Sequence, residues 1–186
     1  MGKPAPGVDL AVIDSDGNEV TANVEGDIAV LVEPNRPQGM FKGYKDDPKR
    51  TSATRKGNWY ITGDRAFVDE DGYFWFVSRA DDVILSAGYR IGPFEVESAL
   101  LEHPSVAESA VVSSPDETRG EIVKAFVVLV EGFERTEKLV KELQGYVKGV
   151  TAPYKYPRKI EFVESLPKTV SGKIRRIELR NKEWSN

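Results

Sequence analysis

Two charged residues in the first half of the chain have the types and spacing to hold a nucleotide. Asp64 follows Gly63 at what we expect to be the end of a strand, and Arg79 comes fifteen residues later. A carboxylate there can accept two hydrogen bonds from the vicinal hydroxyl groups of a ribose, and such charge-assisted bonds are strong. The alternative is a turn aspartate that accepts from a nearby backbone N–H. The run Thr62-Gly63-Asp64 alone favours this alternative.

One lysine near the carboxyl end has the local sequence of a residue that acts on phosphate. Lys173 follows Ser171 and Gly172, so we expect it in a mobile loop rather than in a helix interior. A flexible ammonium could stabilise the negative charge that spreads over phosphoryl oxygens during a transfer reaction. The alternative is a solvated surface lysine, which most lysines are.

A third candidate lies between these two, in the segment Ala87-Gly88-Tyr89. We expect this segment in a loop between a strand and a helix. Because Gly88 has no side chain, a ligand or another backbone could approach it closely. Upstream, Asp81 lies at a predicted domain boundary, where a few residues that change φ and ψ are enough for a hinge. The alternative for Asp81 is a surface aspartate in a loop.

Two other features are interpreted as structural. The stretch Thr51–Gly57 lacks the glycine spacing and the strand-to-helix context of a phosphate loop, so a linker or a short helix is the better interpretation. The only histidine, His103, precedes Pro104 at a predicted helix end and is interpreted as a structural residue rather than a base.

Apolar periodicity predicts the elements that must position these side chains. A helix is expected to begin at Pro93, where the first turn tolerates proline, and Glu95 and Glu97 would favour its positive N-terminus. Further helices are expected over 136–150 and 174–183. The expected strands are 8–13, 28–32, 59–61, 65–68, 73–77, 106–113, 122–130 and 160–163.

This order of elements predicts an α+β protein with two parts. Residues 1–80 should form a β-rich subdomain, and residues 81–186 a small α+β domain with a central sheet covered by helices.

Composition narrows the possible functions. The chain has 186 residues, no cysteine and one histidine, which excludes disulfide scaffolds, thiolate metal sites and multi-histidine sites, and we predict no metal ligands. No apolar run is long enough to span a bilayer, and no signal-peptide pattern is visible, so a cytoplasmic or organelle-matrix location is expected. The net charge is −4, yet residues 151–186 carry nine Lys and Arg against four Glu. Such a basic tail fits an anion site or a solvated face.

In order and spacing, three blocks resemble the carboxyl-terminal half of the adenylate-forming, AMP-binding acyl-CoA synthetases. They are Tyr60–Asp64, Ser78–Pro93 and Pro167–Lys173, and the run Thr151–Lys159 is most similar to the medium-chain acyl-CoA synthetases. The resemblance covers essentially the whole chain. It implies that residues 1–80 are the β-rich end of the large adenylation domain and that residues 81–186 are the mobile carboxyl-terminal domain.

The resemblance also implies roles for individual residues. Asp64 and Arg79 would bind the nucleotide, Lys173 would act in catalysis and bind the nucleotide, and Asp81 would be the hinge between two half-reactions. The polyanionic coenzyme A would lie among residues brought together by folding: Ala87, Gly88, Tyr89, Arg90, Arg119, Lys148, Tyr156 and Arg158. Tyr156 could pack against the adenine or the pantetheine, or could simply belong to the core.

The family's phosphate loop, its adenine- and Mg²⁺-binding segment and its acyl pocket have no counterpart here. We therefore expect a carboxyl-terminal portion of a ligase that is incomplete for catalysis, with a separate chain as one source of the missing part. The complete reaction would use ATP, Mg²⁺ held by ligands outside this chain, a carboxylic acid such as a fatty acid, and coenzyme A, and would release AMP.

Two alternatives belong to other classes. The chain could be a non-catalytic module that binds nucleotide or coenzyme A, or that docks on an upstream partner. Nucleic-acid binding by the basic tail is disfavoured because the aromatic residues are not interleaved with the basic ones. A relative that loads a carrier protein is a further alternative, but the run Tyr154–Lys159 favours coenzyme A.

Overall fold

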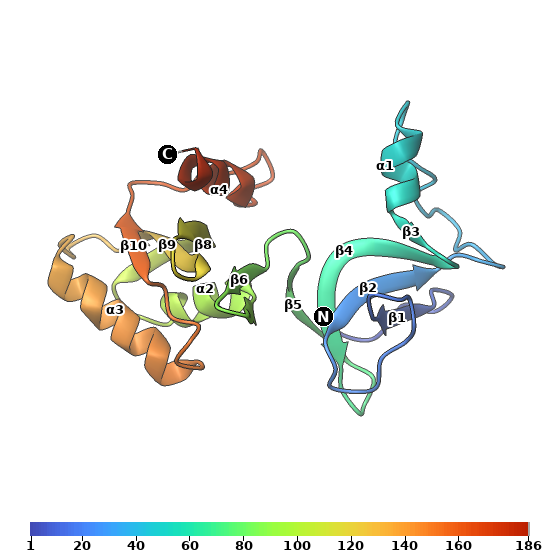
Figure 1. Ribbon diagram of the computed structural model, residues 1–186, viewed down its shortest axis with the longest axis horizontal. Coiled ribbons are helices and arrows are strands. Elements are labelled where there is room, and N and C mark those ends of the chain that lie inside the picture. The colour runs from blue at the N-terminus through green and yellow to red at the C-terminus, as the bar shows by residue number, and fades with distance from the viewer. Residues whose placement is uncertain (186) are drawn as a thin grey trace. The chain divides into compact units, whose positions relative to one another are not determined.

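The computed structural model describes residues 1–185, which divide into two compact units (Figure 1). The first unit is Met1–Asp81 and the second begins at Asp82. Each unit has its own sheet and its own clusters of buried side chains. That these units are parts of a larger enzyme, joined by a hinge, stays a prediction.

The first unit is a five-stranded antiparallel sheet with one short helix. The sheet has the order β1-β2-β4-β3, and β5 also pairs with β4. The elements are β1 Leu10–Ile13, β2 Gly26–Leu31, α1 Pro48–Ala53, β3 Arg55–Lys56, β4 Trp59–Val68 and β5 Phe74–Arg79. Alternation of side chains along β1 and β2 places a small apolar cluster on each face. One contains Val12, Ile28, Ala66 and Phe74, and the other Ala11, Ile13 and Ala29.

The structure corrects the expected position of Asp64. Two strands, 59–61 and 65–68, were predicted with Asp64 after the first, whereas β4 runs without a break through all of these residues. Gly63 has a φ of 83°, and the pairing of β4 with β5 shifts between Arg65 and Ala66. Strand β4 thus continues through Gly63 with a local irregularity, and Asp64 lies within the strand.

The second unit combines a mixed sheet with three helices. The elements are β6 Ile84–Ser86, β7 Tyr89–Ile91, α2 Pro93–Leu101, β8 Val106–Asp116, β9 Gly120–Leu129, α3 Glu137–Val150, β10 Lys159–Phe162 and α4 Arg176–Trp184. The central strand β9 pairs antiparallel with β8 along one edge and parallel with β10 along the other. The predicted α+β class, with helices on a small central sheet, is confirmed.

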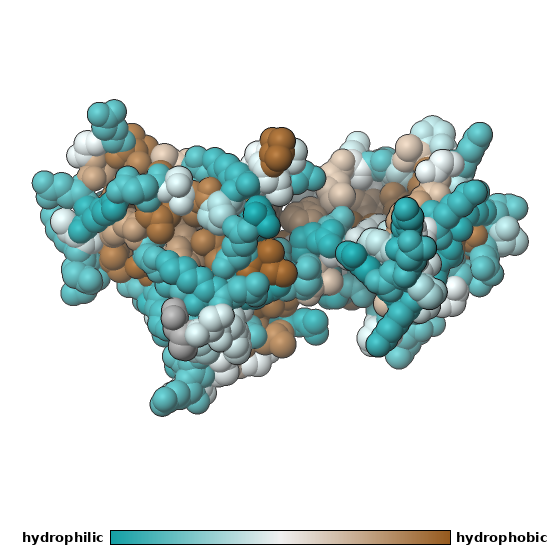
Figure 2. All heavy atoms as spheres, turned by 90° about the horizontal axis from the view of Figure 1, so that it is seen from above, coloured by the Kyte–Doolittle hydropathy of each residue, from teal (hydrophilic) through white to brown (hydrophobic). Residues whose placement is uncertain are grey.

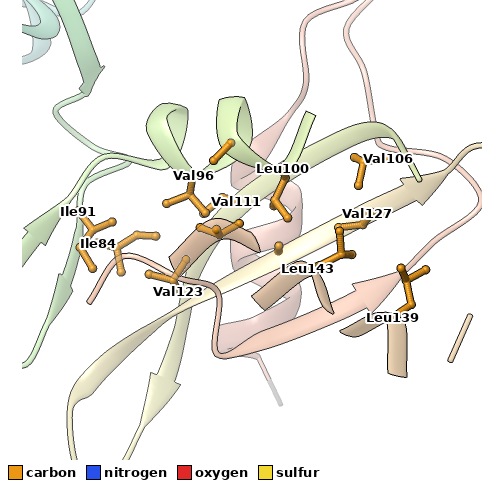
Figure 3. Packing of buried hydrophobic residues seen from close by; sticks show 13 residues of the cluster. Ile84, Ile91, Val96, Leu100, Val106, Val111, Val123, Val127, Leu139 and Leu143 are labelled. Atoms are coloured by element: carbon orange, nitrogen blue, oxygen red, sulfur yellow. The ribbon is translucent and has the colours of Figure 1, made fainter. Parts of the chain in front are cut away.

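Helices cover both faces of this sheet. Figure 3 shows α2 and α3 contributing Val96, Leu100, Leu139 and Leu143 to a cluster that packs on one face of β8 and β9. On the other face, Leu179 of α4 and Leu166 pack against Phe126. Burying one such side chain stabilises the fold by about 1.5–3 kcal/mol, so the larger cluster supplies most of the apolar stabilisation of this unit.

A hairpin that was not predicted replaces the expected loop around Gly88. Strands β6 and β7 pair antiparallel from Ser86 with Tyr89 to Ile84 with Ile91, so Ala87 and Gly88 form a two-residue turn. Both have positive φ, 48° and 85°, as a type I′ turn requires. The segment Ala87-Gly88-Tyr89 is therefore the turn of a hairpin and the first residue of its second strand, and the interpretation as a strand-to-helix loop is wrong.

None of the helices within residues 1–185 combines the length and the apolar character that a membrane span requires. The surface seen in Figure 2 shows apolar patches among polar side chains. Among the exposed large apolar side chains of the second unit are Leu85, Tyr89, Phe94, Leu101 and Tyr154.

Candidate functional site

Asp64 and Arg79 lie opposite each other on neighbouring strands of the first unit. They are register partners in β4 and β5, and Arg79 Nη1 donates to Asp64 Oδ1 at 3.1 Å. Arg79 Nε also lies 3.5 Å from Asp81 Oδ1. The structure thus brings together the three residues predicted to bind nucleotide and to form the hinge in this unit.

Two carboxylates stabilise the charged form of this arginine. Burial alone would lower the pKa of Arg79, but the charges and hydrogen bonds of Asp64 and Asp81 raise it above its ordinary value. The Asp64 side chain remains 31% exposed, so its carboxylate is both oriented by Arg79 and accessible to solvent. An oriented, accessible carboxylate is what a hydrogen bond to a ribose diol needs.

The hairpin turn of Gly88 lies beside a second turn, the one that connects β8 to β9. The Ala87 N–H donates to the carbonyl oxygen of Arg119 at 3.2 Å. The turn that contains Arg119 is stabilised by its own hydrogen bonds, because Asp116 Oδ1 accepts from the N–H groups of Thr118 and Arg119. The backbone at Gly88 is open, since a Cβ added there would meet no atom within 4 Å.

Three of the other predicted coenzyme A residues form one group. Lys148 Nζ lies 3.8 Å from the ring centroid of Tyr156, and Arg158 Cζ lies 4.9 Å from the same centroid. Arg158 Nη1 also donates to the Tyr156 hydroxyl at 2.8 Å. Two cations held over one aromatic ring concentrate positive charge, which suits a phosphate-bearing ligand. Arg90 is an exposed residue of β7, paired with Leu85 across the hairpin, and is not part of this group.

Tyr154 is a residue of this region that was not among the predicted site residues. Its ring stacks on that of Tyr89, with centroids 4.2 Å apart and planes 16° from parallel. Both side chains are partly exposed, at 39% and 52%. The signal that could have found it is its place in the run Thr151–Lys159, two residues before Tyr156.

Lys173 ends a hydrogen-bonded turn just before α4. The Gly172 N–H donates to the Thr169 carbonyl oxygen and the Thr169 N–H to the Lys173 carbonyl oxygen, at 2.9 and 2.8 Å. Gly172 takes the positive φ, 83°, that a three-residue hairpin loop with a bulge requires. Lys173 is exposed, and within residues 1–185 its ammonium has no ion pair. It is therefore available to an anionic ligand, outside both groups of predicted coenzyme A residues.

A buried ion pair anchors the base of this turn. Glu97 is 5% exposed, and its carboxylate accepts from Arg176 Nε at 2.9 Å and from Arg176 Nη2 at 2.6 Å. Glu97 Oε1 also accepts from the Val111 N–H at 2.8 Å. The hydrogen bonds to Glu97 raise the pKa of Arg176 above its ordinary value.

This pair corrects the expected role of Glu97. The residue was assigned to the helix N-terminus with Glu95, but only Glu95 lies in the first turn of α2. The pair instead ties α2, which follows the Gly88 hairpin, to α4, which follows the Lys173 turn. Arg180 of α4 also pairs with Asp82 at 3.2 Å, so the first residue of this unit is held by the same helix.

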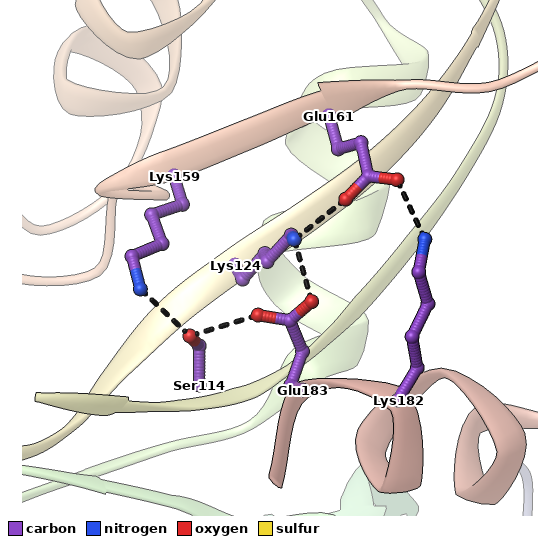
Figure 4. Close-up of polar contacts among 6 residues, drawn as sticks. All are labelled: Ser114, Lys124, Lys159, Glu161, Lys182 and Glu183. Atoms are coloured by element: carbon purple, nitrogen blue, oxygen red, sulfur yellow. Dashed lines mark hydrogen bonds and ion pairs between the residues drawn. The ribbon is translucent and has the colours of Figure 1, made fainter. Parts of the chain in front are cut away.

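A second ion network fixes the far end of α4 on the sheet (Figure 4). Lys124 Nζ donates to Glu161 and to Glu183, both at 2.6 Å, and Lys182 Nζ donates to Glu161 at 2.8 Å. Ser114 Oγ donates to Glu183 and accepts from Lys159. These contacts join β9, β10 and α4, and so support the helix that carries the Lys173 turn at its start.

Comparisons with known proteins agree with this arrangement. Residues 95–173 match the AMP-binding enzyme C-terminal domain. The chain is 64% identical to "Acyl-coenzyme A synthetase ACSM3, mitochondrial" of Pongo abelii, an alignment over 99% of this chain and 32% of that protein. The identity to the Homo sapiens protein of the same name is 63%, over 99% and 32%. The crystal structure of the anthranilate CoA ligase AuaEII in complex with anthranoyl-AMP is similar with a TM-score of 0.87 and 38% identity, over 98% of this chain and 34% of that one.

The second unit of this chain therefore contains an AMP-binding enzyme C-terminal domain, of the kind found in adenylate-forming ligases. More particularly, the chain is similar over nearly its whole length to acyl-coenzyme A synthetases, and it spans about a third of the length of those relatives. The predicted resemblance is confirmed.

Proposed function

We propose that this chain is the carboxyl-terminal portion of an acyl-CoA synthetase that joins a carboxylic acid to coenzyme A. In the first half-reaction, the carboxylate attacks the α-phosphate of ATP to give acyl-adenylate and pyrophosphate. In the second, the coenzyme A thiol attacks the acyl carbon, which gives acyl-CoA, AMP and a proton. The similarity to acyl-coenzyme A synthetases across nearly the whole chain carries this proposal.

Each group of candidate residues has a role in the proposed reaction. Asp64, held by Arg79, would bind the ribose hydroxyls of the nucleotide, and Lys173 would stabilise the charge on the α-phosphate in the first half-reaction. The Gly88 hairpin and the cations around Tyr156 would receive coenzyme A in the second half-reaction. Asp81 would be the hinge about which the carboxyl-terminal domain rotates between the two half-reactions. The exposed Lys173 ammonium and the paired Asp64 carboxylate support these roles.

The remaining requirements belong to the complete enzyme. Among residues 1–185, no group of three or more acidic or histidine side chains could hold a metal ion. We assign Mg²⁺, which would accompany ATP, to ligands outside this chain, because the family's Mg²⁺-binding segment has no counterpart in this sequence. The missing part would come from the same polypeptide or from a separate one. The names of the relatives place those proteins in mitochondria, which favours the organelle matrix over the cytoplasm as the location.

A chimera tests the proposal. The matching third of the Homo sapiens relative is replaced by this chain, and acyl-CoA formation is measured with ATP, Mg²⁺ and a panel of fatty acids. The chimera should make acyl-CoA, and Lys173→Ala should slow adenylate formation about a hundredfold or more, since loss of one such contact costs about 3 kcal/mol of barrier. Lys141→Ala, on the exposed side of α3, is the matched control and should leave the rate unchanged.

The 186-residue chain on its own should form no acyl-CoA. A folded chimera that is inactive, or an equally active Lys173→Ala variant, would contradict the assignment. The competing function, a binding module without catalysis, predicts that calorimetry detects AMP or coenzyme A binding by the chain while the folded chimera stays inactive. Asp64→Ala should remove AMP binding in either case, and Arg119→Ala should weaken coenzyme A binding.

A further inference from the structure

Apart from Arg90, the predicted coenzyme A residues fall into two groups, and the short segment Tyr154–Arg158 contacts both. The first group is the Ala87–Gly88 turn with the turn of Arg119, joined by the hydrogen bond from the Ala87 N–H. The second is Tyr156 with its two cations, Lys148 and Arg158. Tyr154 belongs to the segment of the second group and stacks on Tyr89, the residue that follows the turn of the first.

Core burial does not enforce this stack. Tyr154 is 39% exposed and Tyr89 is 52% exposed, so the two rings meet at the surface rather than in the apolar cluster below. Offset, near-parallel aromatic pairs attract each other beyond the area that they bury. The contact between the two rings therefore attaches the hairpin to this segment, in addition to the pairing of Ser86 with Gly120 that attaches it to β9.

The segment of Tyr154 is itself held in place. The Arg158 N–H donates to the Val123 carbonyl oxygen at 2.8 Å, which attaches the segment to β9. Lys155 Nζ pairs with Glu95 Oε2 of α2 at 2.5 Å, and Pro157 is fully buried. Because this segment is fixed, the Tyr154 ring has a defined position, and the hairpin contacts it through Tyr89.

We infer that Tyr154 is a positioning residue that aligns the two ends of the coenzyme A site. This inference rests on the proposed function and deepens it. Coenzyme A has a narrow pantetheine arm, which suits the open backbone at Gly88, and a phosphorylated adenosine, which suits the cations of Lys148 and Arg158. A ligand that reaches both groups gains affinity when their spacing is fixed beforehand, whereas a ligand that reaches only one group gains nothing.

Calorimetry with a whole ligand and with one of its ends tests this role. The 186-residue chain is titrated with coenzyme A and, separately, with adenosine 3′,5′-bisphosphate. Tyr154→Ala should weaken coenzyme A binding about fivefold, the factor that corresponds to about 1 kcal/mol for an aromatic pair, and should leave bisphosphate binding within twofold. Tyr154→Phe, which keeps the stacking ring, should bind both ligands as the unaltered chain does.

Phe133→Ala removes another exposed aromatic side chain of this unit, outside both groups, and is the matched control. The inference is overturned if Tyr154→Ala binds coenzyme A within twofold of the unaltered chain. It is also overturned if both ligands weaken equally, because Tyr154 would then act on the nucleotide end directly. If the unaltered chain binds neither ligand, the coenzyme A part of the proposed function fails, and the inference fails with it.

Discussion

At Gly63, the absence of a side chain decides where the Arg79 guanidinium can lie. A Cβ at this position would be 2.9 Å from Arg79 Nη2 and 3.3 Å from Cζ. The guanidinium therefore packs on the bare backbone of Gly63 while it donates to Asp64, the next residue of β4. The absence of a side chain at Gly63 thus leaves the room that the Arg79–Asp64 ion pair needs.

Gly63→Ala should destabilise the first unit more than Gly72→Ala does. Both glycines have positive φ, 83° and 79°, so both variants carry a backbone strain of about 1–2 kcal/mol. Only at Gly63 does the added methyl group meet another residue; at Gly72 it meets no atom within 4 Å. Urea unfolding measures the difference, which should disappear when Arg79→Ala is added to both variants. Equal losses in the presence of Arg79 would contradict the packing of its guanidinium on Gly63.

At the scale of the elements, helix α4 is attached to the sheet by a network of polar contacts. Glu161 of β10 accepts from Lys124 of β9 and from Lys182 of α4. Burial would raise the pKa of Glu161, but these two lysines lower it below its ordinary value. For Lys124, burial would lower the pKa, but the hydrogen bonds and charges of Glu161 and Glu183 raise it.

These shifts predict how the docking of α4 depends on pH. A lowered folded pKa of Glu161 contributes stability that is present above its unfolded value of about 4.3 and is lost as the pH falls through the folded pKa. A raised pKa of Lys124 contributes stability that is present below about 10.4 and is lost as the pH rises further. Docking should therefore be unaffected by pH between roughly 5 and 10.

Trp184, at the end of α4, reports this docking, because its indole N–H donates to Ser113 Oγ at 3.2 Å. Its NMR signal should shift in acid below about pH 4. Glu161→Gln should reduce the acid dependence, whereas Glu164→Gln, whose carboxyl is 86% exposed, should leave it unchanged. An acid transition that Glu161→Gln does not alter would exclude Glu161 as its cause.

The elements also show what sequence could and could not predict. Helix α3 was expected over 136–150 because its apolar stripe is regular, and it runs over Glu137–Val150 with Thr136 as its cap. Hairpin β6–β7 was missed because three-residue strands are too short to show a period, and because Ala87 is an unusual residue at positive φ. The Glu97–Arg176 pair joins residues 79 positions apart, which no local pattern reveals.

For the candidate site, too, some features could be predicted from the sequence and others could not. Asp64, Gly88 and Lys173 could be singled out from residue type and spacing, but only the resemblance to a family gave the cations a common ligand. The grouping of Lys148 and Arg158 around Tyr156, and the stack of Tyr154 on Tyr89, depend on the packing of α3 and β10 on β9 and were visible only in the structure.

At the scale of the whole molecule, the two units differ in how much apolar side chain they bury. The main cluster of the second unit has thirteen buried members, whereas the two clusters of the first unit have four and three. A small core leaves little stability after the entropy of folding is offset, so the first unit should be the weaker of the two.

The chain should therefore unfold in urea in two steps, and the first unit should unfold at the lower urea concentration. The tryptophans separate the steps, because Trp59 and Trp75 belong to the first unit and Trp184 to the second. The indole NMR signals of Trp59 and Trp75 should disappear at a lower urea concentration than that of Trp184. A single midpoint shared by all three signals would show that the units unfold together.

The parallel pairing of β10 has a consequence for damaged copies of this protein. Residues Lys159–Phe162 occupy the edge of β9 at Lys124–Val127, and they arrive only after α3 has been synthesised. A premature stop codon between α3 and β10 would leave those β9 backbone groups without partners, in a strand rich in valine. Open apolar edges of this kind recruit strands from other molecules. The shortened product would thus self-associate into insoluble aggregates, in addition to lacking the terminal lysine turn.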